Sequence, residues 1–167
     1  MFNKEQKKQV EHYLSQTAGR IYIGCDSVCY RRYNKQNKTY QQWARYAVVL
    51  VVHIDNSKGC KIFHYTDHER NFDADKNKPR LRLMSEVYKS VECYFEFSEL
   101  LAARDVEIHI DINPDKCHAS NAVAKQALGY VKGTTNIDAL IKPDAWAGSN
   151  SADYVARQKM VGGKKAV

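Results

Sequence analysis

The stretch IYIGCD at residues 21–26 is an apolar run that closes on a single acid, and VEIHID at 106–111 repeats this arrangement later in the chain. Both runs have the length and the β-branched content of buried strands. If the two strands are parallel neighbours, their C-terminal ends share one edge of the sheet, and Asp26 and Asp111 meet there. Strand alternation places Gly24 on the same face as Asp26, so the glycine leaves space beside the acid. This pair of strand ends decides the fold prediction and supplies the first two candidate site residues.

The remaining pattern predicts three strands followed by alternating helices and strands. We expect strands at 20–26 (continuing toward Tyr30), 43–53 and 61–66, and further strands at 106–112 and 137–141. We expect helices at 3–16, 80–103, 120–132 and from 149 or 150 to about 160, with a hairpin tip at 31–38 and a loop at 67–78. Turn-like links make the first three strands antiparallel, and helical crossovers make the later neighbours parallel. The prediction is an α/β fold with a mixed five-stranded sheet flanked by helices, which is the element order of the ribonuclease H fold.

Bulk properties predict a single domain over residues 1–167, with an N-terminal helical extension at 1–18 and a flexible tail at 160–167. The five cysteines include no Cys-x-x-Cys pair, which favours reduced thiols over a disulfide framework or a zinc site. The longest apolar run, at 47–52, is too short to cross a bilayer, and the N-terminus lacks the apolar core of a signal peptide. We therefore expect a cytoplasmic protein that does not associate with a membrane.

Positive charge is concentrated in short segments of a chain whose net charge is +7. Residues 31–38 and 76–82 each carry four basic and no acidic residues, a pattern that attracts phosphate backbones. Tyrosines and Trp43 interleave with the first cluster, which suits stacking on unpaired bases, although tyrosines along a hairpin also pack on one another. Nucleic acid is the predicted partner, and the candidate contact residues are Arg31, Arg32, Lys35, Lys38, Lys76, Lys78, Arg80 and Lys142.

Two further acids complete a candidate site with Asp26 and Asp111. Glu86 lies about 60° beyond the apolar stripe of the helix at 80–103, where it can border the sheet. Asp153 lies in the first turn of the last helix, a position that the helix dipole also favours for an acid without any catalytic role. Taken singly, turn-capping aspartates and a surface glutamate would explain these residues as well; their joint placement favours a site.

Four converging carboxylates offer the hard oxygen ligands that Mg²⁺ and Mn²⁺ prefer. Two such ions about 3.5–4 Å apart can align an attacking water and a leaving oxygen at a phosphodiester. The resulting hypothesis makes Asp26 a ligand of both ions, Glu86 and Asp111 ligands of one, and Asp153 a ligand of the other. Ser27, His109 and Asn113 are candidates for supporting these acids, although His109 fits a buried, hydrogen-bonded histidine better.

Short motifs in this order are similar to a known family. IGCDS (23–27), LRLMSEVYKS (81–90) and EIHIDIN (107–113), with Lys142-Pro143 and SAD (151–153), resemble the bacterial and phage YkuK-like family of predicted ribonuclease H-like nucleases. The resemblance extends from about residue 20 to residue 157. It implies a ribonuclease H fold, an acidic site on the four residues above, and a bacterial cell or a phage-infected host as the setting.

The chain also departs from well-studied bacterial ribonucleases H. Its insert between the third strand and the following helix is longer, and no histidine stands shortly before Asp153. The prediction is a nuclease that uses two Mg²⁺ or Mn²⁺ ions and water as the nucleophile, with an RNA–DNA hybrid, branched DNA or a single strand as substrate. The alternative is a non-catalytic nucleic-acid-binding module that keeps the fold, and a structural phage protein is a third class.

Overall fold

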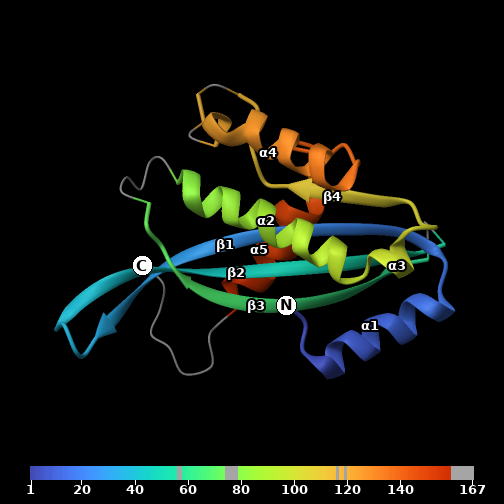
Figure 1. Cartoon of the computed structure of the whole chain (residues 1–167), viewed down its shortest axis with the longest axis horizontal. Helices are drawn as coiled ribbons and strands as arrows, with labels where there is room; N and C mark the ends of the chain where they lie inside the picture. Colours follow the sequence, from blue (N-terminus) through green and yellow to red (C-terminus); the bar gives the residue numbers. More distant parts are fainter. Residues whose placement is uncertain (56–57, 74–78, 116, 119, 159–167) are drawn as a thin grey trace.

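A mixed sheet of four strands, in the order β3-β2-β1-β4, forms the centre of the α/β fold (Figure 1). The computed structural model describes residues 1–55, 58–73, 79–115, 117–118 and 120–158. The strands are β1 (Gly19–Asn34), β2 (Thr39–Ile54), β3 (Cys60–Arg70) and β4 (Val106–Ile110). The helices are α1 (Lys4–Gln16), α2 (Arg80–Glu96), α3 (Ser98–Leu101), α4 (Asn121–Thr135), the π-helix η1 (Ala147–Ala152) and α5 (Asp153–Arg157).

The predicted fifth strand at 137–141 is wrong. Of residues 137–141, all of which the structure describes, only Leu140 pairs with the sheet, through an isolated parallel bridge to His109. Its amide donates to Ile108 O at 2.9 Å, and its carbonyl accepts from Ile110 N at 2.8 Å. Pro143 follows closely and has no N–H to extend a ladder, so this segment adds one rung and not a strand.

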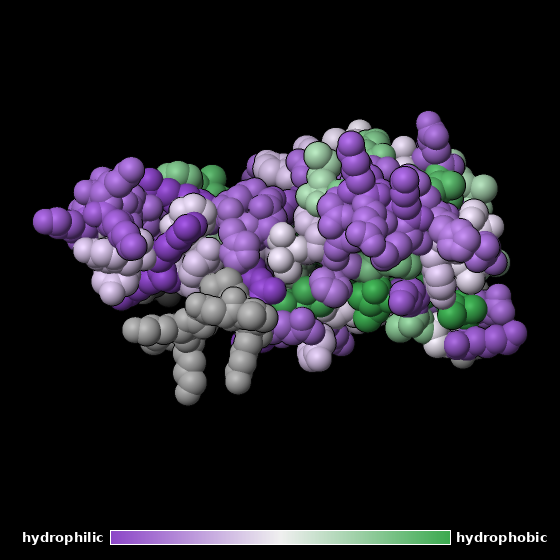
Figure 2. All heavy atoms as spheres, turned by 90° about the horizontal axis from the view of Figure 1, so that it is seen from below, coloured by the Kyte–Doolittle hydropathy of each residue, from purple (hydrophilic) through white to green (hydrophobic). Residues whose placement is uncertain are grey.

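β1 is much longer than predicted. It pairs antiparallel with β2 from Gly19↔Ile54 to Asn34↔Thr39, whereas its parallel pairing with β4 stops at Cys25↔Ile110. Asp26 therefore lies where β4 ends and not where β1 ends. The predicted hairpin tip at 31–38 shrinks to the turn at 35–38, and Arg31 and Arg32 belong to the ladder. The hairpin projects from the body of the molecule, and its projecting end is covered mainly by hydrophilic side chains (Figures 1 and 2).

β3 also runs beyond the predicted strand at 61–66, into residues that were expected to form a loop. Asp67 and Glu69 point toward α2, where Lys89 Nζ lies 2.7 Å from Asp67 Oδ2 and 2.5 Å from Glu69 Oε1. The partner of both acids is a lysine of a helix further along the chain. The polar residues of this stretch therefore indicated a loop in the sequence, although they form the end of a strand.

Helices cover both faces of the sheet. α1, α2 and α3 pack on one face against a core that includes Ile21, Ile23, Leu50 and Phe97. η1 and α5 pack on the other face, against Tyr22 and the alternate residues of β2. α4 packs beside α2, over the β4 side of the sheet.

Several helix boundaries differ from prediction. The predicted helix at 80–103 divides at Phe97, which is 3% exposed and packs its ring 5.5 Å from that of Phe2. α4 passes Gly133 and ends at Thr135, where it is capped by Asn136, whose φ of 60° is left-handed. None of the described helices is long and apolar enough to cross a membrane.

Candidate active site

The four predicted acids come from four separate elements and approach one another where β4 ends. Asp26 lies within β1, Asp111 directly follows β4, Glu86 lies on α2, and Asp153 is the first residue of α5. Burial raises the pKa of Asp26 to about 7, and the negative charges of Asp111 and Asp153 add to this rise. Burial also raises the pKa of Glu86 to about 8, with further contributions from Asp26 and Asp111. Such mutual repulsion requires the carboxylates to be close together in a poorly solvated place.

Glu86 is held by two neighbours on the α2 face of the sheet. Its side chain is almost fully buried, and Oε1 accepts hydrogen bonds from Ser27 Oγ at 2.6 Å and from an Arg82 guanidinium nitrogen at 3.0 Å. The same Arg82 nitrogen donates to Ser27 Oγ at 2.7 Å. The guanidinium therefore offsets part of the cost of burying the Glu86 charge. Ser27, which was predicted to support the acids, contacts Glu86 through this bond, while Arg82 was predicted only as part of a basic segment.

Two more acids are paired with basic side chains. Lys142 Nζ lies 2.8 Å from Asp111 Oδ1, and Arg157 Nε pairs with Asp153 one helical turn away. Lys142 was predicted to contact phosphate, whereas Arg157 was missed although its i, i+4 spacing from Asp153 is visible in the sequence. Three of the four acids thus each have a basic partner, which places positive charge around the cluster.

Close backbone packing joins β1 to η1 beside the acids. A Cβ added at Gly24 would lie 2.6 Å from Gly148 N and 2.8 Å from the carbonyl carbon of Ala147. Gly148 in turn approaches the segment that carries Asp111, because a Cβ there would lie 3.5 Å from Asp111 Cβ. The space that Gly24 was predicted to leave beside the acid is filled by the backbone of η1, and η1 leads directly into Asp153.

His109 supports this packing and has no free ring nitrogen. Its side chain is fully buried, Nδ1 accepts from Ala147 N at 3.0 Å, and Nε2 lies 3.1 Å from Glu107 Oε2. Burial lowers its pKa, which fits a neutral ring that accepts at Nδ1 and donates at Nε2. The interpretation of His109 as a buried, hydrogen-bonded histidine is confirmed.

We expect His109→Ala to lower the free energy of unfolding by about 2 kcal/mol, because it removes a buried side chain and leaves the Ala147 N–H without its acceptor. His12→Ala, at an exposed position on α1, is the matched control and should change stability by less than about 0.5 kcal/mol. Urea denaturation measures both values. Equal stability of the two variants would show that His109 does not hold η1 in place.

The other predicted residues lie in different places. Asn113 Oδ1 accepts a hydrogen bond from Asp115 N at 2.9 Å. This bond stabilises the loop after β4 and does not involve any of the four candidate acids. Arg31, Arg32, Lys35, Lys38 and Arg80 are exposed, whereas Lys76 and Lys78 lie outside the described residues.

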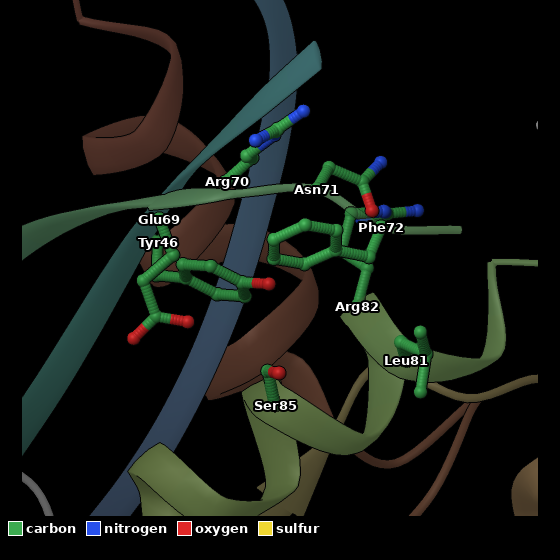
Figure 3. Close-up of a pocket in the computed structure, with 8 residues that line it drawn as sticks. All are labelled: Tyr46, Glu69, Arg70, Asn71, Phe72, Leu81, Arg82 and Ser85. Atoms are coloured by element: carbon green, nitrogen blue, oxygen red, sulfur yellow. The ribbon is translucent and has the colours of Figure 1, made fainter. Parts of the chain in front are cut away.

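A cavity of about 400 Å³ opens beside this site, on the α2 face of the sheet (Figure 3). Arg82 connects the two places, since it lines the cavity and contacts Glu86. The lining residues are Tyr46, Glu69, Arg70, Asn71, Phe72, Leu81, Arg82 and Ser85, and they include none of the four acids.

The carboxylates of the four acids are suitable ligands for a divalent cation, but their present spacing is not suitable for holding one. Carboxylate oxygens are hard ligands, and a cation would offset the burial and the mutual repulsion that raise the pKa values of Asp26 and Glu86. Among the described residues, however, no three His, Cys, Asp or Glu side chains are arranged so that they could hold a metal ion. Binding of a cation would therefore require movement of these carboxylates and of the basic side chains paired with them.

Comparison with known proteins agrees with this architecture. A family model described as Ribonuclease H-like matches residues 4–157, which include all four acids and every described element. No curated protein and no solved structure matches the chain. The match covers most of the sequence, and the chain belongs to the ribonuclease H-like family.

Proposed function

We propose that this protein is a metal-dependent nuclease that hydrolyses phosphodiester bonds in nucleic acid, with water as the nucleophile. The observation that carries the proposal is the approach of four carboxylates from β1, α2, the end of β4 and α5, two of which have pKa values raised to about 7 and 8. Holding these charges together costs stability, and a structural role alone would not require them. Membership of the ribonuclease H-like family supports the same class of reaction.

Asp26, Glu86, Asp111 and Asp153 are the residues that would hold two Mg²⁺ or Mn²⁺ ions. Such ions activate water and stabilise the negative charge that develops on the attacked phosphate. Asp26 has the central place, because both Asp111 and Asp153 act on its pKa. Arg82 and Ser27 fix the Glu86 carboxylate, and His109 holds η1 and hence the start of α5.

Lys142 is positioned to contact the phosphate that is attacked. Its ammonium lies at the Asp111 carboxylate and is partly exposed, so it can bind substrate once the carboxylate takes another partner. Arg157 has the same relation to Asp153. His109 does not act as a base in this scheme, because both ring nitrogens already have partners.

The direct test is cleavage of a labelled panel that contains an RNA–DNA hybrid, a four-way junction, a duplex and single strands. We expect cleavage with Mg²⁺ or Mn²⁺ and none with a chelator. The non-catalytic alternative predicts salt-sensitive binding without cleavage of any substrate, and binding that survives substitution of the acids. That pattern would reject the nuclease and leave a nucleic-acid-binding module.

The raised pKa values also predict how metal-free stability depends on pH. The unfolded pKa values of Asp26 and Glu86 are 3.8 and 4.5, and their folded values are about 7 and 8. The folded protein therefore binds more protons between pH 4 and 8, and these two groups make it less stable as pH rises through this window. Other groups also titrate, so the contribution of Asp26 is isolated by comparison with Asp26→Asn.

We expect the difference in unfolding free energy between Asp26→Asn and wild type to be small at pH 4 and to favour the variant increasingly up to pH 8. Chemical denaturation in a chelating buffer measures it at each pH. A difference that does not change with pH would contradict the burial of an ionising Asp26.

A further inference from the structure

The β1–β2 hairpin has two faces of different chemistry, and one of them continues from Asp26. Residues two apart in a strand share a face, and directly paired residues of neighbouring strands share it too. Tyr30 is paired with Trp43, which is paired with Arg70, and Arg45 is paired with His68. The face of Asp26 therefore carries, toward the turn of the hairpin, six basic or aromatic side chains, which we name the Asp26-side strip: Tyr30, Arg32, Trp43, Arg45, His68 and Arg70.

Contacts between strands join these side chains into one surface. The Arg32 guanidinium lies 5.0 Å from the centre of the Trp43 ring, and Tyr30 Oη lies 2.9 Å from His68 Nδ1. Arg45 donates to the carbonyl oxygens of Ala156, at 3.3 Å, and Gln158, at 2.6 Å. Because Ala156 belongs to α5, the strip is attached to the element that supplies Asp153.

The alternation of β3 keeps acids away from this surface. Asp67 and Glu69 point to the α2 face, where both are paired with the buried Lys89, while His68 and Arg70 point to the strip. Figure 3 shows Arg70 directed away from Ser85 of α2. Negative charge is thus neutralised on one face, and the other face stays positive and aromatic. Charge of this sign between half-buried rings suits a phosphate backbone whose bases are free to stack.

We propose that the Asp26-side strip binds a single strand of nucleic acid that leads to or from the acid cluster. This inference rests on the proposed nuclease function and names its substrate class, namely a single strand or a branched substrate with an unpaired arm. The distance along β1 from Asp26 to Arg32 is about 20 Å, which corresponds to about six nucleotides at the stacked spacing. A continuous duplex would keep its bases paired and could not place them on Trp43 and Tyr30.

Binding is tested without cleavage, by fluorescence anisotropy of a labelled 12-nucleotide single strand in a chelating buffer. Arg32→Ala is compared with Arg31→Ala, because the two arginines are adjacent and exposed but lie on opposite faces of β1. We expect Arg32→Ala to weaken binding about tenfold and to reduce the slope of log affinity against log salt by about 0.7, and Arg31→Ala to change affinity less than about twofold. A duplex of equal length should bind more weakly than the single strand.

A second pair of variants tests stacking. Trp43→Ala should weaken binding about tenfold, whereas Tyr40→Ala, which removes a ring packed on Tyr33 on the opposite face, should have little effect.

Equal effects of Arg31→Ala and Arg32→Ala would overturn the inference, as would equal affinity for the duplex or for an acidic peptide. Strip-dependent binding without cleavage under any metal condition would reject the nuclease but keep the strip. Metal-dependent cleavage that is unchanged in Arg32→Ala would support the nuclease and reject the strip.

Discussion

Gly24→Ala is expected to lower the free energy of unfolding by about 3 kcal/mol and to reduce metal-dependent cleavage about a hundredfold. The added Cβ would lie 2.6 Å from Gly148 N, and the atoms it meets belong to backbone, which cannot rotate away as a side chain can. η1 must therefore move away from β1. Because η1 continues into α5, this movement also displaces Asp153 relative to Asp26.

Gly129→Ala is the matched control for this variant. Gly129 lies in α4, where an added Cβ meets nothing within 4 Å, so alanine should be neutral or should stabilise the helix by about 0.5–1 kcal/mol. Denaturant unfolding and a cleavage assay are measured on both proteins. A Gly24→Ala protein as stable and active as wild type would show that η1 does not pack tightly against β1.

Asp26→Asn is expected to abolish activity while making the metal-free protein more stable. Replacing Asp26 would remove a proposed metal ligand whose pKa both Asp111 and Asp153 raise, and activity should fall about a thousandfold or more. At pH 8 the same change removes a buried charge whose pKa is raised to about 7, which should stabilise the variant by on the order of 2–4 kcal/mol.

Opposite signs for activity and stability distinguish a functional carboxylate from a structural one. Asp138→Asn is a suitable control, because Asp138 is exposed and pairs only with Lys132 among its ionic contacts in the described part of the chain. It should leave both cleavage and unfolding close to wild type. Loss of stability in Asp26→Asn would mean that Asp26 serves the fold.

Much of the candidate site could be predicted from local pattern. Asp26 and Asp111 follow from two apolar runs that each close on an acid, and their approach follows from the parallel pairing of β1 with β4. Glu86 was predicted from helical geometry, which placed it about 60° beyond the apolar stripe, but that geometry did not predict how deeply it is buried. Its burial depends on Ser27 and Arg82, and only tertiary contact brings Ser27 to α2.

Other features depended on partners that are distant in sequence. The ends of β1 and β3 are polar in sequence, which predicted loops. They form strands because β1 continues its pairing with β2, and because Lys89 of α2 pairs with the acids of β3. The pairing of Lys142 with Asp111 has no local signal, since it joins the segment after Leu140 to the end of β4. The fifth strand was predicted from its apolar residues, yet strand formation depends on ladder hydrogen bonds, and among the described bonds to β4, residues 137–141 make only the two at Leu140.

If the four acids form a site for divalent cations, as we propose, the protein should bind Mn²⁺ in solution, and electron paramagnetic resonance measures this binding. Titrations of wild type, Asp26→Asn and Asp111→Asn are compared at pH 8. At this pH protons compete less with the cation for the carboxylates of raised pKa than at neutral pH. Saturable binding by wild type that is strongly weakened in both variants is the predicted result. Binding that is equal in all three proteins, or that is undetectable in wild type, would show that the four acids do not form a cation site.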